Sequence, residues 1–205
     1  MLVYEFMPNG SLAKHLFENS QTLSWNLRLK VALGAAKGLA FLHDEANRKP
    51  IVIHQDFRCS NVLLDSDYNA KLFHFHFAVD GPTNYCQIDM YSIGYLPPET
   101  AMTGRVTSMY DVYRFGVVLL EMLCGRLVVD ENRPSEEGYL VSWAKPFLRN
   151  KDKIFRVLDP RLEWGKSSLI EAYKIGSLAL RCTSVKVENR PSMAEVVEAL
   201  KALQA

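Results

Sequence analysis

The sequence predicts a mainly α-helical fold with a few short β-strands, and three observations lead to this prediction. Apolar residues recur at helical spacing in residues 24–43 and in four segments after residue 100. Short apolar runs bounded by polar turns occur between residues 51 and 73. The chain has 205 residues, of which 48% are hydrophobic and 23% are charged, as expected for one globular domain.

The first predicted helix covers residues 24–43, and Ser24 is a suitable N-cap for it. Its apolar residues are spaced mostly three and four apart and define one face: Trp25, Leu29, Ala32, Ala36, Leu39 and Ala40. A second predicted helix, residues 111–123, is apolar almost all round. Because such a helix must be covered by protein on every side, we expect it at the centre of the fold.

Three amphipathic helices are predicted after the central one, at residues 140–147, 169–180 and 192–203. The last of them follows Pro191 and begins with Ser192 and Glu195, a pair that can form a capping box. In the middle of the chain, apolar runs at 51–53, 62–64 and 70–73 predict brief strands joined by polar loops. Catalytic residues tend to lie on loops held by a rigid scaffold, so we expect any chemistry in this middle region.

The charge balance excludes some classes of partner. The chain has 24 Lys and Arg against 23 Asp and Glu, a net charge of +1, so its overall field does not indicate nucleic acid or an anionic membrane. The longest apolar stretch, residues 115–123, is far shorter than the ~20 residues of a transmembrane helix, and none is predicted. The N-terminus lacks a basic signal-peptide region and the glycine at position 2 needed for myristoylation.

The four cysteines, Cys59, Cys86, Cys124 and Cys182, are scattered along the chain without a C-x-x-C pair. This pattern is typical of free thiols in a reducing compartment rather than of a disulfide framework. We therefore predict a cytoplasmic protein, and we interpret the cysteines as small buried apolar residues.

The middle region contains a motif with a known chemistry. Residues 54–61 read HQDFRCSN, which resembles the catalytic loop H-R-D-x-x-x-x-N of protein kinases. Four further segments resemble kinase motifs in the family's order: the hinge at 2–12 (LVYEFMPNGSL), the A-P-E segment at 94–99 (GYLPPE), the start of the central helix at 111–116 (DVYRFG) and the R-P motif at 189–193 (NRPSM). The sequence is therefore identified as a member of the protein kinase family.

Two segments refine the resemblance. Residues 77–83 (FAVDGPT) and 158–162 (LDPRL) are most similar to plant receptor-like cytoplasmic kinases, which are serine/threonine kinases of immune and developmental signalling. The resemblance implies the mainly α-helical C-terminal lobe of the protein-kinase fold, with short β-strands around the catalytic loop. Residues 1–205 are then one kinase-like domain, truncated at the hinge, without the Gly-rich loop, the phosphate-binding lysine and the helix that carries its glutamate partner.

The resemblance also implies roles for individual residues. Asp56 matches the catalytic base, which accepts the proton of a substrate hydroxyl, and Asn61 matches a magnesium ligand. Arg58 stands where serine/threonine kinases have a lysine beside the γ-phosphate. At the hinge, Glu5 and Met7 match residues around the adenine of ATP, and Leu63 matches the residue beneath it.

Three structural residues are implied as well. Glu99 and Arg190 match a buried ion pair that ties the activation segment to the C-terminal helices, and Asp111 begins the central helix. All three are retained, so we predict that the scaffold of the family is preserved. Ser92 matches a serine or threonine that follows the activation loop, and we interpret it as structural.

The chain departs from the family at the magnesium site. Where the family has D-F-G, residues 74–76 read HFH. Magnesium prefers oxygen ligands, and the neutral imidazole of His74 supplies neither charge nor oxygen. His76 in place of glycine adds a side chain where the family's backbone bends freely. Only Asn61 then remains as a metal ligand, and the catalytic residues Asp56, Arg58 and Asn61 are interpreted as vestigial.

The regulatory residues differ too. Gln55 replaces the arginine of H-R-D, which pairs with a phosphorylated activation loop. The loop at residues 84–89 lacks the serine and threonine residues that relatives phosphorylate. We therefore predict that this chain lacks both the arginine and the phosphorylation sites with which the family regulates its activation loop.

We therefore predict a catalytically deficient kinase-like signalling and interaction module, a pseudokinase. No cofactor is expected, whereas ATP and Mg²⁺ would be needed if the family's activity were retained. The expected partners are other proteins, with receptor kinases and a second copy of the chain as candidates. Contact would run through the hinge face, which we define as Tyr4, Met7, Leu63 and Phe73 and which is uncovered without the other lobe. Such partners would also allow peripheral association with the plasma membrane.

Three alternatives remain open at this point. The chain is a fragment of an active serine/threonine kinase that phosphorylates proteins from MgATP, or it is a relic without selected function. The third alternative concerns His54, His74 and His76, which the family's geometry would bring close together. Three imidazoles suit zinc or copper, although their spacing is not specific for a metal site.

Overall fold

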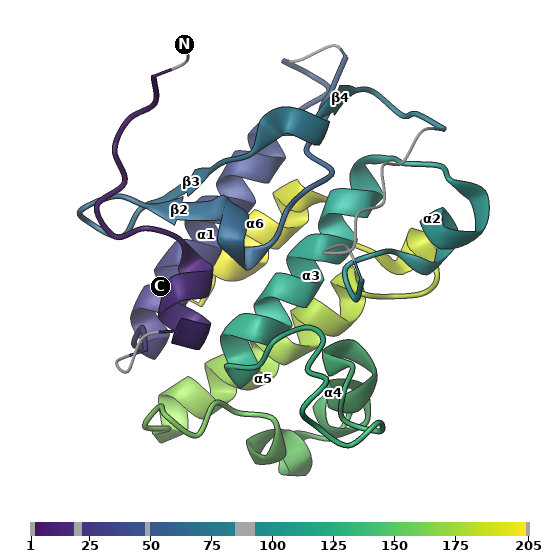
Figure 1. Cartoon of the computed structure of the whole chain (residues 1–205). Helices are drawn as coiled ribbons and strands as arrows, with labels where there is room; N and C mark the ends of the chain where they lie inside the picture. Colours follow the sequence, from purple (N-terminus) through teal and green to yellow (C-terminus); the bar gives the residue numbers. More distant parts are fainter. Residues whose placement is uncertain (1–2, 19–21, 48–49, 85–92, 204–205) are drawn as a thin grey trace.

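The computed structural model describes residues 3–18, 22–47, 50–84 and 93–203. Helices make up most of this part of the chain, and strands are few and short (Figure 1). The α-helices are α1 (Trp25–Leu42), α2 (Pro98–Thr103), α3 (Ser108–Cys124), α4 (Leu140–Leu148), α5 (Lys166–Cys182) and α6 (Met193–Lys201). A π-helical turn (Lys14–Glu18) precedes α1, and 3₁₀ turns cover Cys59–Asn61, Phe75–Phe77, Lys151–Arg156 and Val187–Asn189. The predicted mainly helical fold is confirmed.

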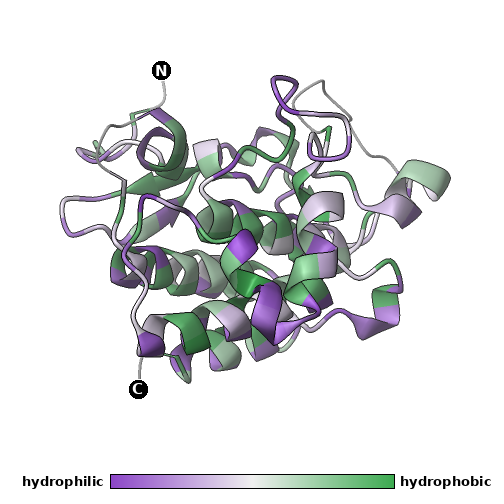
Figure 2. Ribbon diagram, turned by 90° about the horizontal axis from the view of Figure 1, so that it is seen from below, coloured by the Kyte–Doolittle hydropathy of each residue, from purple (hydrophilic) through white to green (hydrophobic). Residues whose placement is uncertain are grey.

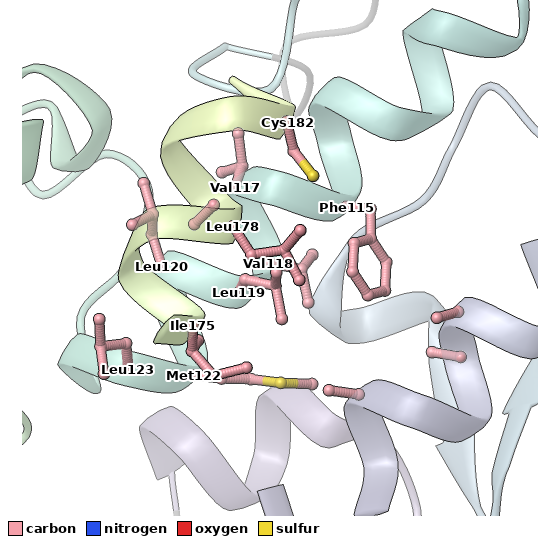
Figure 3. Close-up of a cluster of buried hydrophobic side chains, with 14 of the residues drawn as sticks. Phe115, Val117, Val118, Leu119, Leu120, Met122, Leu123, Ile175, Leu178 and Cys182 are labelled. Carbon is pink, nitrogen blue, oxygen red and sulfur yellow. The ribbon is translucent and has the colours of Figure 1, made fainter. Parts of the chain in front are cut away.

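The central helix is α3, as its sequence predicts. Every residue from 110 to 124 is buried, and α3 packs mainly along α5. Figure 3 shows side chains of both helices in one apolar cluster, among them Val118, Leu119, Ile175 and Leu178. A Cβ atom on Gly116 would lie 2.6 Å from the Cβ of Cys182, so the two helices approach this closely because residue 116 has no side chain.

The first helix, α1, also forms as predicted. The Ser24 side chain accepts a hydrogen bond from the Leu27 N–H and caps the helix. The residues of its predicted apolar face are buried except Ala40, which is half-buried, and the helix packs against α6 on one side and β3 on another. The capping box at Ser192 and Glu195 opens α6, with both reciprocal hydrogen bonds present.

The strands form two small antiparallel pairs. In one pair, β2 (Val62–Leu64) lies beside β3 (Ala70–Leu72), with Leu63 opposite Lys71. In the other, β1 (Val52–Ile53) pairs with β4 (Val79–Asp80), which the sequence analysis did not predict. Because β4 has only two residues, its local sequence carries no strand pattern, and its extended backbone depends on the distant β1. The β2–β3 pair contacts α1, and the β1–β4 pair contacts α3. The two loops that connect these pairs, residues 54–61 and 73–78, are thereby held over α1 and α3 (Figure 1).

Two further features were not predicted from the sequence. The short helix α2 begins with Pro98 at its first turn and ends at Gly104, which has a φ of 69°. Arg28 on α1 forms a buried ion pair with Asp159, with 2.6 Å between Nη2 and Oδ2, and donates to the carbonyls of Leu23 and Met122. This pair links α1 to the segment after α3.

Three of the cysteines, Cys59, Cys124 and Cys182, are free and buried, and Cys86 lies outside the described residues. In the part of the chain that the structure describes, no helix has the length and apolar character required to span a bilayer.

A buried carboxyl group lies in the middle of α3. Glu121 accepts hydrogen bonds from the Tyr95 hydroxyl (2.6 Å), the Cys59 thiol (3.1 Å) and the Val128 N–H (3.2 Å). Burial raises the pKa of Glu121 to about 7, although these three donors act to lower it. Glu121 therefore binds its proton more tightly in the folded chain than in the unfolded chain.

This raised pKa predicts a pH-dependent effect of Glu121→Gln. Since the pKa is about 7 in the folded chain and the ordinary value is 4.5, the stability contributed by Glu121 falls as the pH rises between these values. The amide does not titrate, so the stability of the variant relative to the parent should improve from pH 5 to pH 8. Urea unfolding at the two pH values measures this, with the exposed Glu163→Gln as the control. An equal difference between variant and parent at both pH values would show that Glu121 does not titrate in this range.

Candidate active site

The catalytic-loop segment is fixed to the centre of the fold by Asp111. Its carboxylate accepts hydrogen bonds from the backbone N–H groups of His54 (2.8 Å) and Gln55 (3.0 Å), and it lies 2.9 Å from Nε2 of His43. Burial acts to raise the pKa of Asp111, but the hydrogen bond and charge of His43 and the contact with His54 outweigh it, so the pKa is lowered. Gln55 has a φ of 62°, a strained value that this anchoring maintains.

His54 lies beneath the catalytic loop as a structural residue. Its Nδ1 accepts a hydrogen bond from the Asp56 N–H (3.2 Å), so Nε2 carries the proton and donates to the Phe73 carbonyl at 3.0 Å. The ring packs against Phe75 with 4.7 Å between the centroids. Burial lowers the pKa of His54, which favours its neutral form.

Asp56, the predicted catalytic base, is surrounded by donors. Its Oδ2 lies 2.8 Å from Nδ1 of His74, 2.7 Å from Nδ2 of Asn61 and 3.3 Å from Nη2 of Arg58. Its Oδ1 lies 3.2 Å from Nη1 of Arg114. Only 2% of the Asp56 side chain is exposed, so these donors, rather than water, satisfy the carboxylate.

His74, which is predicted to replace the metal-binding aspartate of the family, contacts Asp56. An ionised carboxylate only accepts hydrogen bonds, so Nδ1 of His74 is the donor in its contact with Asp56. The backbone of His74 has a φ of 65°, a left-handed conformation that histidine adopts more readily than most residues. The side chain is 38% exposed, which places it at the rim of the site with its ring turned to Asp56.

The replacement of glycine by His76 does not strain the backbone. His76 lies in the 3₁₀ turn Phe75–Phe77, and the positive φ of this segment belongs to His74 instead. The ring of His76 packs beside those of His74 and Phe77, with centroids 6.2 and 5.1 Å apart. The turn therefore accommodates a side chain at residue 76.

The proposed zinc or copper site finds no support in the geometry. Both ring nitrogens of His54 are used in hydrogen bonds, and Nδ1 of His74 contacts Asp56. Within residues 3–18, 22–47, 50–84 and 93–203, no cluster of three or more His, Cys, Asp or Glu has a metal-binding arrangement.

Arg114 is a site residue that the sequence analysis missed. It lies on α3 with 1% of its side chain exposed, contacts Asp56, and places its guanidinium 5.5 Å from the ring centre of Tyr95 and 5.2 Å from that of Tyr110. A signal was present, because an arginine inside the most apolar helix of the chain must be paired to be buried.

The predicted adenine-binding residues lie together on the hinge face. Glu5, Met7 and Leu63 line an open hollow of about 480 Å³ together with Tyr4, Phe6, Gly10, Lys71, Leu72 and Phe73. Tyr4 and Phe73 contact edge to face, with ring centres 5.8 Å apart. Tyr4 is 68% exposed and Phe73 36%, whereas Met7 and Leu63 are half-buried.

The predicted ion pair between Glu99 and Arg190 is present. Both oxygens of Glu99 accept from the guanidinium, at 2.6 and 2.7 Å, in a bidentate arrangement. Arg190 also donates to the carbonyls of Met109 (3.0 Å) and Ser184 (2.9 Å). The Arg190 side chain is fully buried, but that of Glu99 is 29% exposed, so the pair is less buried than predicted.

Ser92 lies outside the described residues, as does most of the loop at 84–89.

Comparison with known proteins supports the kinase resemblance over the whole chain. Residues 1–200 match the family described as protein tyrosine and serine/threonine kinase. The chain is 55% identical to receptor-like cytoplasmic kinase 176 of Oryza sativa subsp. japonica, with 100% of this chain and 52% of the relative covered. It is also 55% identical to the probable serine/threonine-protein kinase PBL9 of Arabidopsis thaliana, with coverage of 100% and 50%.

The chain thus spans about half the length of the curated relatives it matches. Within that span, Asp111 on α3 holds the catalytic-loop segment, and Glu99 pairs with Arg190. The chain belongs to the protein tyrosine and serine/threonine kinase family.

Proposed function

We propose that this chain forms the C-terminal lobe of a serine/threonine kinase-like domain in a signalling protein of the receptor-like cytoplasmic kinase type. Its relatives, which are named as serine/threonine-protein kinases and a receptor-like cytoplasmic kinase, support the type. The anchored catalytic loop and the Glu99–Arg190 pair support the lobe. We further propose that residues 1–205 act as one domain and that the protein acts in the cytoplasm of a plant cell, in immune signalling among other pathways.

The finer proposal is that the site is deficient in phosphotransfer, and one observation carries it. His74 stands where the family has the aspartate of D-F-G, and its Nδ1–H is bonded to the Asp56 carboxylate at 2.8 Å. The contact replaces a metal ligand with a donor directed at the catalytic base. Asp56 is thereby engaged in four hydrogen-bonding contacts before any substrate hydroxyl approaches.

The donor set does not fit magnesium. Mg²⁺ prefers oxygen ligands in octahedral geometry, usually with one or two carboxylates. Asn61 donates its amide nitrogen to Asp56 and offers only its neutral amide oxygen to a metal, while His74 offers imidazole nitrogen in place of carboxylate oxygen. The hollow at Glu5, Met7 and Leu63 suits a purine on one side, and we propose it as a weak adenine site.

A second candidate is an active kinase that phosphorylates proteins from MgATP. The retained residues Asp56 and Asn61 favour it, as does the similarity to relatives named as kinases. In that case Asp56 must exchange its contact with His74 for a contact with the substrate hydroxyl, whose proton it would accept as general base.

A radiolabel transfer assay separates the two candidates. The segment of the rice relative that precedes the matched region is joined to residue 1, so the outcome does not depend on what precedes this chain. We expect no incorporation from γ-labelled ATP with Mg²⁺ or Mn²⁺. Incorporation that disappears in Asp56→Ala would establish the active kinase instead.

We propose that the hinge face binds other proteins, with receptor kinases as candidates and a second copy of the chain as the simplest case. At ~25 cal/mol per Å², burying the exposed parts of Tyr4 and Phe73, together with the neighbouring Phe6, favours association. Light scattering of the chain over a concentration series should show a mass that rises with concentration, and Tyr4→Glu should reduce this rise. A parent that stays monomeric and binds no hydrophobic dye would contradict self-association.

A further inference from the structure

The near-neutral net charge of the chain conceals one strongly basic segment. Residues 139–158 contain a single acidic residue, Asp152, and five basic residues. They belong to α4, to the 3₁₀ turn Lys151–Arg156 and to the junction between them. We call these five side chains the basic surface: Lys145, Arg149, Lys151, Lys153 and Arg156.

The basic surface is presented to solvent. Arg149, Lys151, Lys153 and Arg156 are exposed and Lys145 is half-buried, and none of the five forms an ion pair with any residue in the described ranges. Ile154 anchors the 3₁₀ turn in the core, on the face that it shares with Lys151. The Arg156 guanidinium lies 5.2 Å from the ring centre of Phe147, and Nζ of Lys151 lies 6.0 Å from that of Tyr173, so these two exposed cations also contact the body of the protein.

An exposed aromatic side chain lies in the same 3₁₀ turn as Lys151, Lys153 and Arg156. Phe155 is 67% exposed, although phenylalanine has no polar atom to favour contact with water. In a 3₁₀ turn, residues three apart share a face, so Phe155 lies beside Asp152, and Lys153 lies beside Arg156. The helix dipole of α4 accounts for a cation such as Lys145 in its last turn, but it does not account for an exposed phenylalanine.

We propose that the basic surface and Phe155 bind an anionic membrane surface. Four to eight Lys and Arg on one face attract acidic lipid headgroups, and a phenylalanine among them can enter the interface between headgroups and acyl chains. A phosphorylated peptide would favour arginine forks, whereas three of the five cations are lysines. No membrane-spanning helix is required for such binding.

The basic surface lies at the end of the molecule opposite to the β1–β4 pair. The 3₁₀ turn and α4 lie at the lower end of Figure 1, and β1 and β4 lie at the upper end. Figure 2 views the molecule from below, with this lower end toward the reader and hydrophilic ribbon on the short helical turns there. A membrane at this end would lie on the far side of the molecule from β4.

Vesicle sedimentation tests the proposal with the full chain. At 0.15 M NaCl we expect binding to vesicles of phosphatidylcholine with 30% phosphatidylserine and none to pure phosphatidylcholine. The double variant Lys151→Glu/Lys153→Glu should lower the apparent affinity at least about tenfold, and Phe155→Ser should lower it as well. The control Lys14→Glu/Lys37→Glu changes two exposed lysines elsewhere by the same charge and should bind as the parent does.

Circular dichroism of each variant shows whether it folds, and because all substituted side chains are exposed we expect parent spectra. Three results would overturn the proposal: no sedimentation with phosphatidylserine vesicles, an equal loss in the control, or binding to polyglutamate beads without binding to vesicles. The last result would assign the basic surface to an acidic protein partner.

Discussion

In the chimera with the rice relative's preceding segment, His74→Asp should raise the rate of phosphotransfer about a thousandfold over the parent. The substitution restores the carboxylate of the family's metal site and removes the donor that contacts Asp56 at 2.8 Å. Metal stabilisation of the transferring phosphoryl group contributes several kcal/mol, and ~4 kcal/mol corresponds to about a thousandfold in rate. Incorporation of γ-labelled phosphate into a serine-containing peptide measures the change.

Two controls make this result specific. His74→Asn removes the imidazole without supplying a carboxylate, so it should remain close to the parent rate. His74→Asp/Asp56→Ala supplies the metal ligand but removes the general base, so it should lose the gain. A His74→Asp chimera no faster than the parent would show that residue 74 does not limit the chemistry.

Arg190→Ala should destabilise the chain by about 3 kcal/mol, a large share of the ~5 to 15 kcal/mol available to a domain. The substitution leaves Glu99 without its bidentate partner and leaves the carbonyls of Met109 and Ser184 without the guanidinium. Since Glu99 is 29% exposed, water compensates part of its charge and limits the loss.

Urea unfolding followed by circular dichroism measures the effect of Arg190→Ala. Arg133→Ala is the matched control, because Arg133 pairs with Asp130 at 3.0 Å on an exposed part of the surface and should contribute less than about 1 kcal/mol. An Arg190→Ala variant as stable as Arg133→Ala would show that the pair does not support the fold.

The sequence predicts the helices of this chain better than its short segments, for a physical reason. Helix α3 has a continuous apolar surface and α1 has a cap and a periodic face, so local residues alone determine them. The two-residue strand β4 is extended because β1 pairs with it, and nothing in Val79 or Asp80 indicates that partner.

The candidate site shows the same difference. The positions of Asp56 and Asn61 follow from one motif of eight residues, and the structure brings them to hydrogen-bonding distance. The contact of His74 with Asp56 and the burial of Arg114 against the same carboxylate depend on tertiary packing between β3, the catalytic loop and α3. A motif identifies such residues, but it does not specify which of their atoms meet.

The most direct test of the account is the effect of Mg²⁺ on nucleotide affinity, since His74 is proposed to leave the site without its metal carboxylate. The affinity of the chimera for a fluorescent ATP analogue is measured with Mg²⁺ and with a chelator. We predict that Mg²⁺ changes the affinity of the parent less than about twofold and tightens that of His74→Asp at least about tenfold, or roughly 1.4 kcal/mol. A parent whose affinity tightens as much as that of His74→Asp would contradict the account.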